Sequence, residues 1–404
     1  MPREPDQSSL NGFQARNGRA RRVAIVADYL EEGWPSMDLV AEMITSCLRV
    51  AAADEFEPEL IRPPMVLRFS KRGVGKKRLA RKLFNADRVI NRFFDYPRFL
   101  HTIKSRFDLY HVADHSYAHL TQTLAPLRTV VTCHDLDAFQ SVLEPARMRR
   151  SIGFRMMTRR ILNGFRAAAK IGCDSKATHS EILRHRLCRP DSSRVIPIGV
   201  AAEFSPNPDA RADRAASFIA GSKTSESIEI LHVSSTIPRK RIDVLLKVFA
   251  AVRREVPAAR LIRAGGPFTK AQNELARALG VGSAIVQAPF VERATLAALY
   301  RRAAIVMAPS ENEGFGLPVL EAMACGAPVL ASAIAALREV GGDAAEYAPV
   351  GDIEAWTAAA LRMLGERGAA IAADRRAAAL ARAAGFTWNA TARRYAALYR
   401  EMLA

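Results

Sequence analysis

No apolar run in the 404-residue chain approaches the ~18 residues that a helix needs to span a bilayer. The first 22 residues, MPREPDQSSLNGFQARNGRARR, are polar and basic, and they lack the apolar centre of a secretory signal. We expect residues 1–21 to be a disordered lead-in and the protein to work in the cytoplasm.

Cysteine is scarce, with five residues that are scattered, odd in number and without paired spacing. This pattern is typical of reduced thiols in a cytosol, and it argues against a zinc site. His111, His115 and His119 recur at regular intervals, but nothing nearby supplies the carboxylate or cysteine spacing of a metal site. We therefore predict no metal and no other cofactor.

Acidic residues are also in short supply, because 41 Asp and Glu face 59 Lys and Arg, which gives a net charge of +18. Such a charge points to nucleic acid, anionic lipid or an anionic substrate as the partner. Helix-turn-helix, zinc-finger and RNA-binding signatures are absent, so we expect no nucleic acid partner. A membrane surface that carries a lipid-linked acceptor fits the charge better.

The most basic segment, residues 68–106, mixes lysine and arginine with aromatic and aliphatic residues along a stretch that can form a helix. This composition suits the interface of an anionic membrane, so we expect the protein at the inner face of the cell membrane. A solvated helix whose apolar face packs on its own domain explains the same pattern. Both interpretations stay open.

A chain of this length suggests two domains, and 49% hydrophobic with 25% charged residues is typical of a globular protein. Short apolar runs with branched residues alternate with helical patterns, as in parallel sheets that are covered by helices. The predicted strands fall within residues 22–28, 58–61, 107–112, 128–133, 170–175, 194–200, 228–233, 259–264, 284–291, 303–308 and 328–332.

Residues 303–332, AAIVMAPSENEGFGLPVLEAMACGAPVLAS, are predicted to form a strand, a loop, a helix and a strand. Pro318 suits the first turn of the helix, where its missing N–H costs nothing. Glu313 then lies in the loop and Glu321 lies in the helix, both at the carboxyl edge of a parallel sheet, where such sheets bind ligands.

The glycines of this loop, Gly314 and Gly316, let the backbone approach a ligand closely. The N–H groups of the first helical turn face that ligand with the positive end of the helix dipole. Such a site suits a molecule that carries both hydroxyl groups and negative charge. A capped helix with solvated acids is the alternative, but it does not account for a Gly-Phe-Gly turn between Glu313 and Glu321.

The stretch from residue 313 to residue 329 resembles the signature of glycosyltransferase family 4, E-G-F-G-L-P-x-x-E-A-M-A-x-G-x-P-V. That family consists of retaining nucleotide-sugar transferases of the GT-B fold, in which two Rossmann-like, doubly wound α/β domains face a central cleft. The resemblance implies that Glu313 contacts the donor sugar and that Glu321 holds the ribose. The amides of Phe315, Gly316 and Leu317 would contact the sugar and the phosphates.

The same resemblance implies the domain organisation. Residues 22–200 would form the N-terminal acceptor domain and residues 201–385 the donor-binding domain, with the boundary near Gly199. Residues 386–404 would form a helix that crosses back to the first domain, anchored by Trp388, Tyr395 and Tyr399. No internal repeat is visible beyond the similarity of the two domains.

The predicted strand 128–133 runs into His134-Asp135, where the family also carries a His-Asp pair. The resemblance implies that His134 reaches the donor sugar and that Asp135 lies on the acceptor side. His134 could instead be a core histidine that bonds the backbone. Asp135 and Asp137 match the letters of the metal-binding Asp-x-Asp element, but we assign them to the His-Asp loop, so no divalent metal is implied.

A second strand-to-helix turn, SSTIPRKR, follows the strand 228–233. Cations at such a turn are well placed to neutralise a diphosphate, which predicts this role for Arg239 and Lys240. The family carries a Gly-Arg pair where this chain has Ser234-Ser235, so more of the task falls to the two remaining cations. The resemblance also implies donor contacts for Gly33 and Val291.

These expectations converge on transfer of a glycosyl unit from a nucleoside diphosphate sugar to an acceptor hydroxyl, with retained anomeric configuration. By family habit the transfer would be of the mannosyl type, onto a glycan or a lipid-linked acceptor, as in polysaccharide biosynthesis. The alternative is a catalytically inactive protein that binds nucleotide sugars or a membrane surface and keeps the fold.

Overall fold

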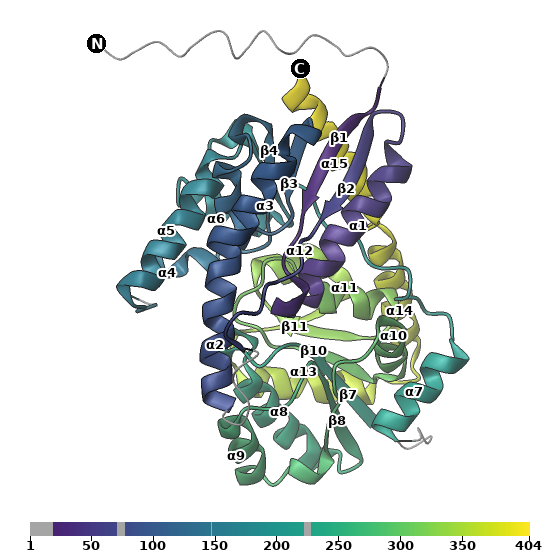
Figure 1. The fold of residues 1–404 in the computed structure, drawn as a ribbon. Coiled ribbons are helices and arrows are strands. Elements are labelled where there is room, and N and C mark those ends of the chain that lie inside the picture. Colours follow the sequence, from purple (N-terminus) through teal and green to yellow (C-terminus); the bar gives the residue numbers. More distant parts are fainter. Residues whose placement is uncertain (1–18, 71–76, 147, 222–227) are drawn as a thin grey trace. The chain divides into compact units, whose positions relative to one another are not determined.

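The computed structural model describes residues 19–70, 77–146, 148–221 and 228–404 (Figure 1). Residues 1–18 of the predicted disordered lead-in and residues 71–76 of the predicted basic segment lie outside these ranges, whereas Arg21, assigned to the lead-in, begins a strand. The described strands form two sheets of six strands each. Within each sheet, the neighbouring strands whose register is given run parallel to each other. None of the helices in the described ranges combines the length and the apolar character that crossing a membrane requires.

The first sheet has the strand order β2-β1-β3-β4-β5-β6. Its strands are β1 (Arg21–Val26), β2 (Phe56–Ile61), β3 (Leu109–Val112), β4 (Thr129–Cys133), β5 (Lys170–Cys173) and β6 (Ser193–Val195). Each strand falls at a run predicted from the sequence. All residues of β3 and β4 are buried, which explains why apolar and polar residues do not alternate regularly in these two runs.

The second sheet has the order β12-β11-β10-β7-β8-β9. Its strands are β7 (Ile228–Val233), β8 (Ala259–Ala264), β9 (Ile285–Gln287), β10 (Ile305–Ala308), β11 (Val329–Ser332) and β12 (Glu346–Ala348). The bounds of β7 and β8 are those predicted. The sequence analysis missed β12, which is only three residues long.

Fifteen α-helices accompany the sheets in the described part of the chain. They are α1 (Pro35–Ala51), α2 (Lys77–Ile90), α3 (Tyr96–Ile103), α4 (Gln140–Leu143), α5 (Ile152–Ala167), α6 (Lys176–Arg184), α7 (Ala210–Ala220), α8 (Ile242–Glu255), α9 (Lys270–Ala278), α10 (Arg293–Arg302), α11 (Leu317–Ala324), α12 (Ala335–Gly341), α13 (Ile353–Gly365), α14 (Ala370–Ala384) and α15 (Trp388–Leu403). One core cluster joins α8, α9 and α13 to the second sheet through buried residues such as Phe249, Leu261 and Trp356.

The chain divides into two compact units. One contains residues 1–131, 163–169 and 392–404, and the other contains residues 132–162 and 170–391. The domain boundary near Gly199 stays a prediction. Within the first unit, the predicted anchor Tyr399 is fully buried, and its hydroxyl lies 2.7 Å from Nδ1 of His111.

Candidate functional site

The loop between β10 and α11 places the predicted acids and amides within the second unit. Gly316 has φ of 107°, a left-handed conformation that favours glycine, and it caps the start of α11. Leu317 and Pro318 form the first turn of the helix, as expected from the sequence. Phe315, whose amide was the predicted contact, is buried.

Glu313 pairs with both cations of the predicted phosphate turn. Its carboxylate accepts a hydrogen bond from Nζ of Lys240, and it lies 3.0 Å from Nη1 of Arg239. Burial alone would raise the pKa of Glu313, but the two neighbouring cations outweigh this effect and hold the pKa below its ordinary value. Glu313 is therefore ionised at neutral pH, although only 11% of its side chain is exposed.

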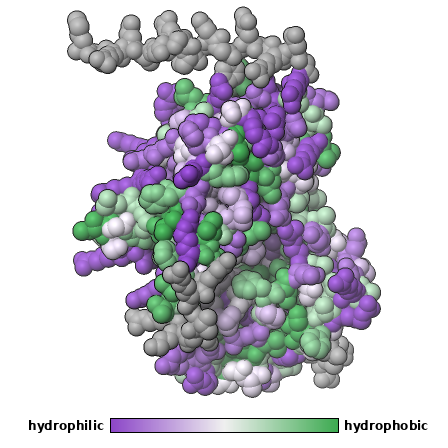
Figure 2. All heavy atoms as spheres, viewed as in Figure 1, coloured by the Kyte–Doolittle hydropathy of each residue, from purple (hydrophilic) through white to green (hydrophobic). Residues whose placement is uncertain are grey.

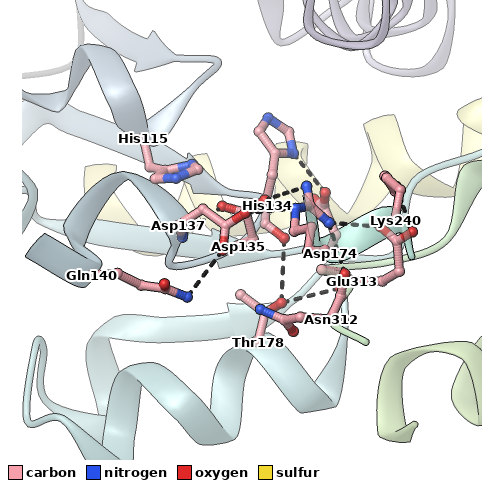
Figure 3. Close-up of polar contacts among 12 residues, drawn as sticks. His115, His134, Asp135, Asp137, Gln140, Asp174, Thr178, Lys240, Asn312 and Glu313 are labelled. Carbon is pink, nitrogen blue, oxygen red and sulfur yellow. Dashed lines mark hydrogen bonds and ion pairs between the residues drawn. The ribbon is translucent and has the colours of Figure 1, made fainter. Parts of the chain in front are cut away.

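Arg239 connects this acid to the loop that follows β4. Its guanidinium lies 2.6 Å from Asp137 and 3.4 Å from Asp135, and it donates to the Asn312 carbonyl at 2.8 Å (Figure 3). Two cations thus face three carboxylates in one cluster. In this structure both predicted phosphate ligands are occupied by acids, so a bound diphosphate has to share or displace these ion pairs.

His134 is held by a neighbouring acid that the sequence analysis did not identify. Nδ1 of His134 lies 2.6 Å from Oδ2 of Asp174, which directly follows β5 and is 1% exposed. The partner of the imidazole is therefore a carboxylate rather than the backbone group that a core histidine was expected to use. Asp174 fixes the orientation of the ring.

The backbone around His134 also contacts the acidic loop. The carbonyl of Gly314 accepts hydrogen bonds from Ser175 Oγ at 2.6 Å and from Thr178 Oγ1 at 3.1 Å, and Thr178 Oγ1 reaches the His134 carbonyl at 3.3 Å. A Cβ on Gly314 would collide with the carbonyl oxygen of His134. Glycine is required here because the two loops pack backbone against backbone.

Glu321, the predicted ribose ligand, lies in α11 and is 9% exposed. The hydroxyl of Tyr300 donates to its carboxylate at 2.9 Å. Burial raises the pKa of Glu321 to about 7, although the bond from Tyr300 and the charge of Arg293 act in the opposite direction. A ligand hydroxyl that donates to this carboxylate would favour its ionised form.

The remaining predicted donor contacts, Val291 and Gly33, lie in different units. Val291 is half-buried in the turn between β9 and α10, in the same unit as Glu313. Gly33 belongs to the other unit and has φ of 69° at the end of a short 3-10 turn. Gly199 packs so tightly that a Cβ would collide with the backbone nitrogen of Trp388, which accounts for this glycine without a ligand.

Sequence reasoning missed two charged side chains, Asp174 after β5 of the first sheet and Arg263 in β8 of the second sheet. Asp174 stands in the tripeptide Cys-Asp-Ser directly after an apolar strand, the same kind of position that drew attention to His134. Arg263 interrupts the apolar strand β8, and a charge at a buried strand position was the available signal. Among the residues that the structure describes, no group of three or more His, Cys, Asp and Glu side chains could hold a metal ion.

Two family models match the chain. The model described as "Glycosyltransferase Family 4" matches residues 42–204, and the model described as "Glycosyl transferases group 1" matches residues 213–380. The D-inositol 3-phosphate glycosyltransferase of Kineococcus radiotolerans is 32% identical over 255 residues, which is 58% of this chain and 57% of the relative. The chain spans about half the length of the curated relatives that it matches.

Solved structures show the same fold. Sucrose-phosphate synthase from Thermosynechococcus elongatus superposes with a TM-score of 0.70 at 21% identity, over 94% of this chain and 98% of that one. Anabaena HepE, solved in complex with UDP and glucose, superposes with a TM-score of 0.69 at 15% identity, over 94% and 100%. These likenesses confirm the predicted GT-B fold, and the two glycosyltransferase models, one for each half of the chain, confirm the predicted resemblance to family 4 and group 1.

Proposed function

We propose that this protein transfers a glycosyl unit from a nucleoside diphosphate sugar to an acceptor hydroxyl, with the anomeric configuration retained. The observation that carries the proposal is the cluster of Glu313, Lys240, Arg239 and His134 at one edge of the second unit. Breaking the donor bond leaves an anionic diphosphate and a cation-like sugar. The cluster offers a partner for each of these charges.

The two cations would stabilise the leaving diphosphate. Lys240 and Arg239 are already ordered by Glu313, so little reorganisation is needed when a phosphate replaces or shares the carboxylate. The N–H groups at the start of α11 add the positive end of a helix dipole. Glu313 would then be free to accept hydrogen bonds from the hydroxyls of the sugar.

His134 would orient the sugar from the opposite loop. Its imidazole is oriented by Asp174 through Nδ1, and Nε2 is the ring nitrogen that would meet the substrate. Asp135 would serve the acceptor side, and it lies in the same loop as His134. Because the ring is already fixed, less side-chain conformational entropy is lost when a substrate binds.

The donor and the acceptor are proposed by class. The HepE structure contains UDP and glucose, and the Kineococcus relative is named for D-inositol 3-phosphate, so a nucleotide sugar and a polyol acceptor fit the comparisons. A mannosyl-type transfer onto a glycan or a lipid-linked acceptor is the finer proposal. A role in polysaccharide biosynthesis would follow from such an acceptor.

We also propose that residues 68–106 bring the protein to the cytoplasmic face of an anionic membrane. In the described part of this segment some apolar residues pack inside, as Phe93 and Leu100 do, but Phe94 is 64% exposed and Phe99 is 38% exposed. Arg98 is exposed beside Phe99. In the region of α2, hydrophobic and hydrophilic side chains adjoin one another (Figure 2), which supports an interfacial role.

The test is a screen of UDP-, GDP- and ADP-sugars by thermal shift, followed by assays of sugar hydrolysis and transfer with the donors that bind. Activity should be lost in Glu313→Ala and in Lys240→Ala. Lys247→Ala, which removes an exposed lysine from α8, is the matched control and should keep activity. Binding of a nucleotide sugar without any turnover would favour the inactive binding protein instead.

A further inference from the structure

Arg263 carries a buried positive charge at the edge of the sheet that holds the candidate site. It is the penultimate residue of β8, and its side chain is 0% exposed. Nη2 donates to the carbonyl of Ser234 at 2.6 Å, whereas Nε and Nη1 have no hydrogen-bond partner. No described carboxylate forms an ion pair with it.

Burying a positive charge without a carboxylate partner costs free energy, unless a bound anion neutralises it. A buried charge without a partner disfavours the ionised form, and burial lowers the pKa of Arg263 to about 10. The group nevertheless stays ionised at neutral pH. The ring of Phe268 lies 5.5 Å from its guanidinium carbon and offers a partial compensation only.

The neighbouring His232 adds no negative charge to the surroundings of Arg263. Nδ1 of His232, which is fully buried, lies 2.8 Å from the Met307 carbonyl. Desolvation, Arg263 and Lys240 together lower the pKa of His232 to about 4, so the imidazole is neutral at physiological pH. His232 therefore does not neutralise the positive charge of Arg263.

The turn Ser234-Ser235 lies directly over the guanidinium. Ser234 is half-buried and Ser235 is exposed, so the turn that Arg263 bonds from the buried side reaches solvent on its other side. Gly265, with φ of 113°, packs against the same turn, and a Cβ there would collide with the Ser234 carbonyl. Arg239 and Lys240 follow within the next turn of chain, but their charges are taken by carboxylates.

We propose that Arg263, which bonds the Ser234 carbonyl, supplies a further positive charge to the diphosphate of the donor, beside those of Arg239 and Lys240. The inference rests on the proposed function, because it places a nucleoside diphosphate at this edge. Arg263 acts through the field of its charge and through the turn that it supports, so it is a positioning residue. Charges interact strongly over such distances where water is excluded.

A purely structural role would consist of tethering the Ser234 carbonyl, and two substitutions separate the alternatives. Arg263→Gln keeps an N–H donor for the carbonyl but removes the charge. Arg263→Lys keeps the charge but not the planar donor geometry. If the charge of Arg263 matters, the lysine variant should bind nucleotide as the wild type does. If the hydrogen bond to the Ser234 carbonyl matters, the glutamine variant should bind nucleotide as the wild type does.

The experiment measures binding of UDP, GDP and ADP to the full chain by calorimetry, with the corresponding nucleosides as probes that lack the diphosphate. For the nucleotide that binds best, we expect Arg263→Gln to lower the affinity roughly tenfold or more and Arg263→Lys to stay within about threefold. Nucleoside binding should not change. Adding Ser235→Arg to the glutamine variant should restore most of the lost affinity.

Wild-type affinity in Arg263→Gln, or an equal loss in the glutamine and lysine variants, would overturn the inference while leaving the proposed function intact. If the wild type binds none of the three nucleotides, the proposed function fails first and the inference with it. Where the variants do not fold, a structure of the wild type with the nucleotide decides. A phosphorus atom within about 10 Å of the Arg263 guanidinium supports the inference, and a greater distance refutes it.

Discussion

Nδ1 of His134 lies 2.6 Å from Oδ2 of Asp174, and both residues directly follow parallel strands of one sheet, β4 and β5. Because a carboxylate can only accept here, Nδ1 carries the proton of this hydrogen bond. Asp174 is more deeply buried than His134, at 1% against 7% exposure. The carboxylate therefore orients a ring that is itself buried.

Asp174→Ala should lower kcat/KM for sugar transfer at least about tenfold, because the ring of His134 loses the partner that fixes its orientation and tautomer. A merely structural role of Asp174 would leave the tautomer of His134 unchanged. The tautomer is measured by ¹⁵N NMR of the imidazole. Asp191→Asn, which removes an exposed acid paired with Arg189, is the control. An unchanged His134 tautomer in Asp174→Ala would contradict this assignment.

Gly314→Ala tests the close packing between the two loops. The added Cβ would meet the carbonyl oxygen of His134, so the loops must separate or the substitution must destabilise the unit. We expect a loss of about 2 kcal/mol or more in the free energy of unfolding, measured by urea denaturation. Gly282→Ala is the matched control, because no atom lies within 4 Å of its Cβ position. Equal stability of the two variants would show that the loops do not pack in this way.

Much of the fold could be predicted because buried parallel strands have a strong local signal. The runs at β7 and β8 are short, apolar and bounded by polar turns, and their predicted bounds coincide with the observed ones. By contrast, β12 has only three residues, and α9 has few buried positions, so neither stands out from its surroundings. Residues 115–122, for which no helix was predicted, form a 3-10 helix with mostly buried residues.

The candidate site was predictable only where a motif carried it. Glu313 and Lys240 were found because each stands in a recognisable turn, but their mutual ion pair depends on how two distant turns meet. The same holds for Asp174, whose partner His134 is 40 residues away. Spacing along the chain says nothing about such contacts. They follow from the order of strands in a sheet, which the sequence does not reveal directly.

The exposed phenylalanines after α2 give the membrane proposal its sharpest test. Replacing both Phe94 and Phe99 by serine should reduce pelleting with vesicles that contain anionic lipid, because each exposed ring contributes apolar area to an interface. Phe218→Ser, at a phenylalanine that is 93% exposed on α7, is the matched control and should pellet like the wild type. Pelleting that is equal for all three proteins would favour the interpretation of a solvated helix.

The raised pKa of Glu321 predicts a pH dependence of stability with a definite sign. In the folded protein this pKa is about 7, above the ordinary value of 4.5 that applies to the unfolded chain. The protonated carboxyl is thus favoured by folding, and its contribution is fully present below pH 4.5 and is lost as the pH rises to about 7. A shift of this size corresponds to at most about 3 kcal/mol.

Glu321→Gln removes this titration while it keeps an acceptor for the hydroxyl of Tyr300. The free energy of unfolding of the variant, relative to the wild type, should therefore increase between pH 4.5 and pH 7 and level off above it. Urea denaturation across this range measures the difference. Glu274→Gln, at an exposed acid on α9, should follow the wild type throughout. A difference between Glu321→Gln and the wild type that stays flat with pH would mean that Glu321 is not held protonated by burial, and that the ribose would meet a carboxylate already ionised.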